Sequence, residues 1–349
     1  MNQFIQIKID NFTNYISNAI YLSNMNINNT TSIFNYIKKN IKYNEYWYCH
    51  YPLYLEKNNI HKLSKKIKYL INVDFLFLQR NQIIKLPKEI KCLTQLQVLC
   101  LSYNKLTKLP KEIKFLTGLK LLNLSHNQLT KFPKEICHLP LLNNLNLSYN
   151  KLTRLPNEIK YMKLLSHLFV NNNKLIKLPN EIKYLRLFEL SVQHNKLTKL
   201  SKSIKSLKLM SQLDISYNKI KVLPKEIKYL TTMRYLYIQS NKIKAIPKEI
   251  KFMKYLYIFD ASNNYLTFIP KEIKFLTELY ILSINNNCLT KLPYELKYLT
   301  NIIYLSLCSN KINNIKPLKY LIMNVKKTLC IKINNNQLIY TFPFSKICK

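Results

Sequence analysis

Apolar residues recur along the chain in a fixed, uneven pattern that repeats many times. In the stretch 96–116 they occupy positions 96, 99, 101, 106, 109, 113 and 116, and a polar residue, Asn104, interrupts them. Leu99 and Leu101 lie two residues apart, which predicts a short strand with both side chains on one face. We expect Asn104 to turn the chain after that strand.

The second half of the same stretch predicts a short helical turn. Pro110 suits the first position of such a turn, and the charge of Glu112 favours the turn's N-terminus. Ile113 and Leu116 are three residues apart and are expected to face the core from the side opposite the strand.

The pattern recurs with a period of 23 residues. Aligned on the asparagine, it repeats at Asn58, Asn81, Asn104, Asn127, Asn150, Asn173, Asn195, Asn218, Asn241, Asn264, Asn287, Asn310 and Asn336. Every step is 23 except a step of 22 after Asn173 and a step of 26 at the end. One such unit buries too few apolar side chains to offset the entropy of ordering its backbone, so the units must stack on one another.

This unit, with its Leu-Pro-x-Glu-Ile segment, resembles the leucine-rich repeat family, and most closely the intracellular Ras-binding scaffolds with 23-residue repeats. The resemblance covers about residues 48–340. It implies an α/β solenoid shaped as a curved horseshoe, with parallel strands on the concave face and short helical turns on the convex face. It implies little about function, because leucine-rich repeats bind many unrelated partners.

The ends of the chain depart from the repeat. We expect residues 1–47 to form a capping segment that is partly helical, with an amphipathic helix over 31–43. The alternative for this segment is a small docking module, such as an adaptor to a ubiquitin ligase. About thirteen repeats fill 48–340, the last of them degenerate and preceded by an insertion, and 341–349 form a tail.

The composition limits the cellular compartments and the catalytic activities that the chain can have. The eight cysteines show no paired spacing, the N-terminus lacks the apolar core of a signal peptide, and no long apolar run predicts a membrane span. An intracellular, cytoplasmic protein is therefore expected. The chain has a single glycine, whereas phosphate-binding loops and nucleophile elbows need two or more. We expect no enzyme activity, no cofactor and no metal site.

The net charge of +38 has two interpretations. Lys, Asn, Ile and Tyr have AT-rich codons, so an AT-rich genome supplies lysines that simply form a solvated face. The alternative is a basic adaptor that binds nucleic acid or an anionic membrane through lysines on the convex side. The lysines follow the asparagine by one, four, seven and ten residues, as Lys105, Lys108, Lys111 and Lys114 do. We see no systematic alternation of aromatic residues with these lysines, which disfavours a dedicated binder of single strands.

The outward strand positions lie six, four and two residues before each asparagine, and in the eleven units from Asn81 to Asn310 none of them is Lys or Arg. Aromatic residues among uncharged polar groups and carboxylates are typical of a protein interface. We therefore predict that a protein partner binds the concave face. The predicted contact residues are Phe169, Glu189, Gln193, Gln212, Asp214, Tyr235, Tyr237, Asp260 and Tyr304.

The resemblance suggests a small GTPase or another signalling protein as the partner, and host proteins are a further possibility if the source is a virus or protist. No small-molecule substrate is expected. The rival interpretation of the contact residues is drift at exposed strand positions. The shortened repeat beside them also replaces Leu-Pro-Lys-Glu-Ile with Leu-Ser-Lys-Ser-Ile at 200–204, which indicates either a kink or binding feature, or a decaying repeat.

Overall fold

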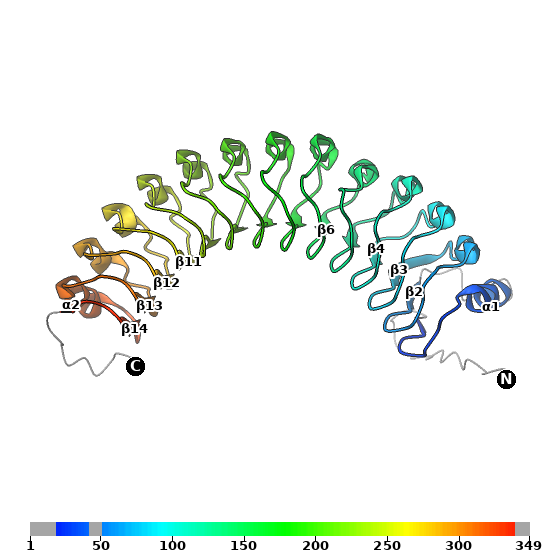
Figure 1. Ribbon diagram of the computed structural model, residues 1–349, viewed down its shortest axis with the longest axis horizontal. Coiled ribbons are helices and arrows are strands. Elements are labelled where there is room, and N and C mark those ends of the chain that lie inside the picture. Colours follow the sequence, from blue (N-terminus) through cyan, green and yellow to red (C-terminus); the bar gives the residue numbers. More distant parts are fainter. Residues whose placement is uncertain (1–18, 42–50, 339–349) are drawn as a thin grey trace. The chain divides into compact units, whose positions relative to one another are not determined.

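The computed structural model describes residues 19–41 and 51–338 of the chain. They fall into two compact units, Met1–Asn173 and Lys174–Lys349. Each unit is a stack of turns in which one side carries a short strand and the other side a helical turn (Figure 1). The predicted leucine-rich repeat solenoid is confirmed in both units.

The strands of the first unit pair in parallel and in chain order, from β1 to β7. They are β1 (Ile20–Tyr21), β2 (Tyr51–Tyr54), β3 (Val73–Phe77), β4 (Val98–Cys100), β5 (Leu121–Asn123), β6 (Asn144–Asn146) and β7 (His167–Phe169). Between them stand 3-10 turns, η2 (Lys65–Tyr69), η3 (Lys88–Cys92), η4 (Lys111–Phe115), η5 (Lys134–His138) and η6 (Asn157–Tyr161). The helix α1 (Thr31–Ile41) precedes β2 and ends two residues before the predicted limit.

The second unit repeats this arrangement with strands β8 to β14, also parallel and in order. Its strands are β8 (Glu189–Ser191), β9 (Gln212–Asp214), β10 (Tyr235–Tyr237), β11 (Ile258–Asp260), β12 (Ile281–Ser283), β13 (Tyr304–Ser306) and β14 (Cys330–Lys332). Its 3-10 turns are η7 (Asn180–Tyr184), η8 (Lys202–Ser206), η9 (Lys225–Tyr229), η10 (Lys248–Phe252), η11 (Lys271–Phe275) and η12 (Tyr294–Tyr298). The predicted insertion is the α-helix α2 (Lys316–Asn324), which stands where other repeats have a 3-10 turn.

The leucines of the repeat form the core as predicted. Leu99, Leu101, Ile113 and Leu116 are fully buried. The proline lies one residue earlier than expected: Pro110, at φ −69° and ψ 148°, is the residue before η4 rather than its first helical residue. A proline fits this position because its fixed φ matches the extended backbone that enters the turn.

The asparagines hold adjacent turns together. The side chain of Asn104 accepts a hydrogen bond from the Ile83 N–H at 2.9 Å and donates to the carbonyls of Leu78 at 2.9 Å and Leu101 at 3.1 Å. The same set recurs in turn after turn, so these buried asparagines satisfy backbone groups that the short strands leave unpaired.

The 22-residue repeat is one residue shorter between η7 and β8. In most repeats the residue after the 3-10 turn has ψ between 42° and 65°, whereas Leu185 is extended at ψ 161°. Three residues, 186–188, lead from Leu185 to β8, one fewer than lead from Met162 to β7. The next turn, η8, keeps its 3-10 form without proline or glutamate, because the hydroxyl of Ser201 accepts a hydrogen bond from the Ser203 N–H at 3.2 Å. The altered segment is therefore a capped version of the same turn.

Residues 19–41 are not outside the stack. β1 pairs with β2, and the side chain of Asn58 donates to the Leu22 carbonyl at 2.8 Å, as the other asparagines do to the preceding turn. Ile33, Phe34 and Ile37 of α1 are buried. This segment covers the first repeat, while the division of the chain at residues 47 and 340 stays a prediction. No helix in the described ranges is long and apolar enough to span a membrane.

Candidate functional site

The strand face is the set of side chains six, four and two residues before each repeat asparagine, and it lies on the inner side of each unit (Figure 1). All nine predicted contact residues are on it and all are partly exposed. Phe169 belongs to the first unit, at the end of β7, and the other eight belong to the second unit.

Strand register arranges the second unit's residues in two rows. The upper row is formed by residues six before the asparagine, and in it Glu189, Gln212 and Tyr235 are aligned across β8, β9 and β10. The lower row is formed by residues four before the asparagine, and in it Asp214 and Asp260 flank Tyr237 on the two neighbouring strands. The structure therefore brings together a tyrosine pair and three carboxylates. Tyr304 is not part of this group, because β12 separates its strand from β11.

The carboxylates are held by short-range hydrogen bonds. The Gln212 side chain donates to Glu189 Oε1 at 2.7 Å. Asp214 Oδ1 accepts from the backbone N–H of Ser216 at 3.0 Å and from its hydroxyl at 2.6 Å. Asp260 Oδ1 accepts from the Ser262 N–H at 2.9 Å. These contacts fix the carboxylates without neutralising their charge.

Burial shapes the electrostatics of the lower row. It raises the pKa of Asp214, and the hydrogen bonds from Ser216 oppose that rise only in part. Burial, followed by the negative charge of Asp214, also raises the pKa of the Tyr237 hydroxyl. No Lys or Arg occupies the outward positions of the strands on either side of Asp214. The approach of a cation is therefore favoured, because pairing offsets the lost hydration of the carboxylate.

Two tyrosines beside the predicted group were missed. Tyr257 lies edge-on to Tyr235 with ring centroids 6.3 Å apart, and Tyr280 stacks on Tyr257 at 4.8 Å. Both precede their strands, seven residues before the asparagine, a position that alternation along the strand does not mark as outward. The signal in the sequence was the recurrence of tyrosine at that offset in adjacent repeats.

The predicted exposure of the third outward column, the residues two before each asparagine, was too high. Where the residue two before the asparagine is serine, as in Ser125, Ser148 and Ser216, it is buried and offers little surface. Gln193, in the same column, stays partly exposed, with Ser216 Oγ 3.4 Å from its Oε1. The working surface of the strand face is therefore mainly the two rows six and four residues before the asparagine.

The 3-10 side carries more aromatic residues than the sequence prediction allowed. In seven turns a lysine ammonium lies over the ring of the next residue, at 4.9–5.3 Å from its centroid. The pairs are Lys114–Phe115, Lys160–Tyr161, Lys183–Tyr184, Lys228–Tyr229, Lys251–Phe252, Lys274–Phe275 and Lys297–Tyr298. The expectation that aromatic residues do not alternate with these lysines was wrong.

The described residues hold no cluster of three or more His, Cys, Asp or Glu side chains that could bind a metal ion. Among them, Cys92, Cys100, Cys137, Cys288 and Cys308 are free thiols. Burial raises the pKa of Cys100 to about 11 and that of Cys137 to about 12, which opposes formation of a reactive thiolate at either position.

Comparison with known proteins agrees with this architecture. The leucine rich repeat family model matches residues 94–152, 117–175 and 185–243. A leucine-rich repeat protein of Leptospira interrogans is 36% identical, with a TM-score of 0.78, over 82% of this chain and 72% of that one. No curated protein matches the sequence.

Two more distant structures share the fold alone. An internalin of Listeria monocytogenes is 21% identical with a TM-score of 0.75, over 91% of this chain and 86% of that one. A plant peptide hormone receptor, solved in complex with its peptide RGF2, is 24% identical with a TM-score of 0.69. That match covers 84% of this chain and 52% of the receptor chain.

Proposed function

Because the chain belongs to the leucine-rich repeat family, we propose that it is a non-catalytic scaffold that binds a protein partner through the strand face of its second unit. The observation that carries the proposal is the row in which Asp214 and Asp260 flank Tyr237, with Tyr235 beside it. Half-buried tyrosines are common anchors of protein interfaces, and carboxylates around them select a basic contact region.

The charge distribution supports this choice of surface. In a chain with 55 Lys and Arg residues, none occupies an outward strand position between residues 189 and 308. Lys332, four residues before Asn336 in the last turn, does occupy an outward strand position, and its ammonium lies 5.7 Å from the ring centroid of Tyr304. A partner segment with Lys or Arg residues and an apolar side chain for the tyrosines fits this surface. Such a segment on a small GTPase or another signalling protein, in an intracellular setting, is the specific form of the proposal.

Quantitative capture from cell extract tests the proposal. Wild-type protein and the double variant Tyr235→Ala with Tyr237→Ala are compared by mass spectrometry of the bound partners. The matched control is Tyr255→Ala with Tyr298→Ala, which removes two exposed tyrosines of the same unit, one in the turn after η10 and one in η12. We expect the strand-face variant to lose a partner that the control keeps, with a drop in affinity of about tenfold or more. Retention of every partner by the strand-face variant would show that the chosen surface is wrong.

The carboxylates provide a second test on any partner recovered. Asp214→Asn with Asp260→Asn keeps the shape of the row and removes its charge. We expect slower association and a weaker dependence of the association rate on salt, because these charges steer a basic partner. A partner whose association rate is unchanged binds without help from the carboxylates.

A further inference from the structure

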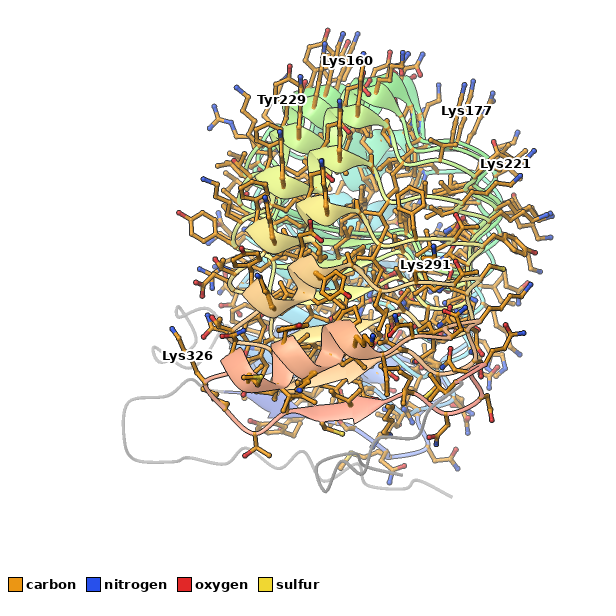
Figure 2. The ribbon with its side chains drawn as sticks, turned by 90° about the vertical axis from the view of Figure 1, so that its left-hand side faces the viewer. Lys160, Lys177, Lys221, Tyr229, Lys291 and Lys326 are labelled. Carbon is orange, nitrogen blue, oxygen red and sulfur yellow. The ribbon has the colours of Figure 1, made fainter. Side chains whose placement is uncertain are left out.

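A second surface of the second unit carries lysines with no acidic residue among them, and we call it the lysine edge. It consists of Lys174, Lys177, Lys196, Lys199, Lys219, Lys221, Lys242 and Lys244, which follow the asparagines of four successive turns. All eight are exposed, and none takes part in an ion pair within the described ranges. Figure 2 shows Lys221 on this edge, and Lys291 farther along the same side, away from Tyr229 on the 3-10 side.

The backbone holds these lysines in register. The N–H groups of Lys196, Lys219 and Lys242 donate to the carbonyls of Leu175, Leu197 and Ile220, each at 2.8 Å. Each lysine of this column is thus bound to the turn before it. Because adjacent strands are about 4.8 Å apart, the lysines form a row with a regular, short repeat.

The lysine edge contains no acidic residue. The segments 174–178, 196–200, 219–223 and 242–246 hold eight lysines and neither Asp nor Glu. On the 3-10 side, by contrast, η9, η10 and η11 each carry one Glu between two Lys. The second lysine of each of these turns, Lys228, Lys251 or Lys274, also lies over an aromatic ring, which leaves it less free. The charge of the edge is therefore wholly uncompensated, whereas that of η9 to η11 is offset in part, and η8 carries two Lys and no acidic residue. The sequence predicted lysines on both the edge and the convex side.

An aromatic stack borders the same edge. The rings of His194 and Tyr217 are parallel within 13° and their centroids are 4.0 Å apart. Each ring stands two residues before a lysine of the edge, Lys196 or Lys219. The next turn has the small Ser240 at this position, and no ring or cation of the described part of the chain stacks on the other face of Tyr217. Tyr217 is 45% exposed.

We propose that the lysine edge binds single-stranded nucleic acid. The phosphates follow the lysine row, and a base stacks on the open face of Tyr217. A flexible strand with one charge per nucleotide matches a linear row of cations, and its binding releases condensed counterions. A ring beside a basic track is the usual platform for an unpaired base, whereas a duplex offers no unpaired base to stack.

The edge fits an anionic membrane less well. Membrane-surface elements bury a continuous apolar face beside their cations. Here the other exposed residues of the four segments are Ile176, Thr198, Val222 and Ala245, of which only Ile176 and Val222 are large and apolar. The apolar contribution to membrane binding is therefore small.

Fluorescence anisotropy with a labelled 20-nucleotide single strand tests the proposal, with the matching duplex and anionic vesicles as alternative probes. The edge variant changes Lys196, Lys199, Lys219 and Lys242 to Gln. The control variant changes Lys202, Lys205, Lys225 and Lys248 to Gln, which removes the same charge from exposed positions on the 3-10 side. We expect the edge variant to lower the slope of log Kd against log salt by up to about 3, and the control to change it by less than about 1.

Tyr217→Leu separates stacking from charge. We expect it to weaken binding of the single strand by about fivefold or more without changing the salt slope, while Tyr255→Leu, in the turn after η10, has no effect. Equal losses in the two lysine variants would mean that net charge alone drives binding and would overturn the proposal. So would the absence of binding to the single strand, a preference for duplex or vesicles, or an unaltered affinity in Tyr217→Leu.

Discussion

Asn127 offers the sharpest test of how the stack is held together. Its side chain is 7% exposed and makes four hydrogen bonds. Oδ1 accepts from the Leu106 N–H at 2.9 Å, while Nδ2 donates to the carbonyls of Leu101, Leu124 and Ser125 at 2.9, 3.1 and 3.2 Å. The substitution Asn127→Ala removes all four bonds and leaves a small void.

The cost follows from which groups keep another partner. The Leu101 carbonyl still accepts from Asn104, and the Leu124 carbonyl still accepts from Asn150. The buried Leu106 N–H loses the partner that the structure records for it. An unpaired buried N–H costs about 1–3 kcal/mol, and each of the other lost bonds contributes about 0.5–1 kcal/mol. We therefore expect Asn127→Ala to lower the free energy of unfolding by about 3–5 kcal/mol.

Urea denaturation followed by circular dichroism and by tyrosine fluorescence measures this value. Coincidence of the two transitions is checked first, because long repeat arrays can unfold in more than one step. The matched control is Asn143→Ala, an exposed asparagine in the same unit, which we expect to change stability by less than about 0.5 kcal/mol. A loss below about 1 kcal/mol for Asn127→Ala, or one equal to the control, would refute the role assigned to the asparagines.

Three further predictions concern single side chains. His126 is stacked between Tyr103 and Tyr149, and burial lowers its pKa below the ordinary 6.5. The unfolded chain therefore binds a proton more readily than the folded protein, and the free energy of unfolding should fall as the pH drops below 6.5. In thermal melts at pH 5–8, His126→Phe should weaken this dependence. Cys137, buried and with its pKa raised to about 12, should resist iodoacetamide at pH 8 until the protein unfolds, and rapid alkylation of the native protein in peptide mass spectra would contradict this. Ser201 has φ −63° and ψ 140°, which proline can adopt. Ser201→Pro should change the free energy of unfolding by less than about 1 kcal/mol, because the lower entropy of the unfolded chain stabilises the protein and the loss of the serine cap destabilises it. A loss above about 2 kcal/mol in urea denaturation would contradict this.

The sequence predicted which strand positions of the candidate site face outward, but not every residue that contributes to its surface. Alternation along the strand correctly identified Tyr235, Tyr237 and Asp214 as outward residues. It missed Tyr257 and Tyr280, because each stands one residue before its strand, where the alternation does not apply. It also counted Ser148 and Ser216 as surface, although a short side chain in that column is covered by its neighbours.

The sequence by itself determined the architecture. A 23-residue spacing of leucines and asparagines, interrupted at only two steps, requires the units to stack in order to bury their apolar faces, and this information is local to each repeat. The tertiary structure alone decided which residues of different repeats become neighbours at contact distance. The stack of His194 on Tyr217 and the Asp214–Tyr237–Asp260 row depend on side-chain directions and on burial. Those quantities arise only when adjacent turns are packed together, so no pattern within one repeat specifies them.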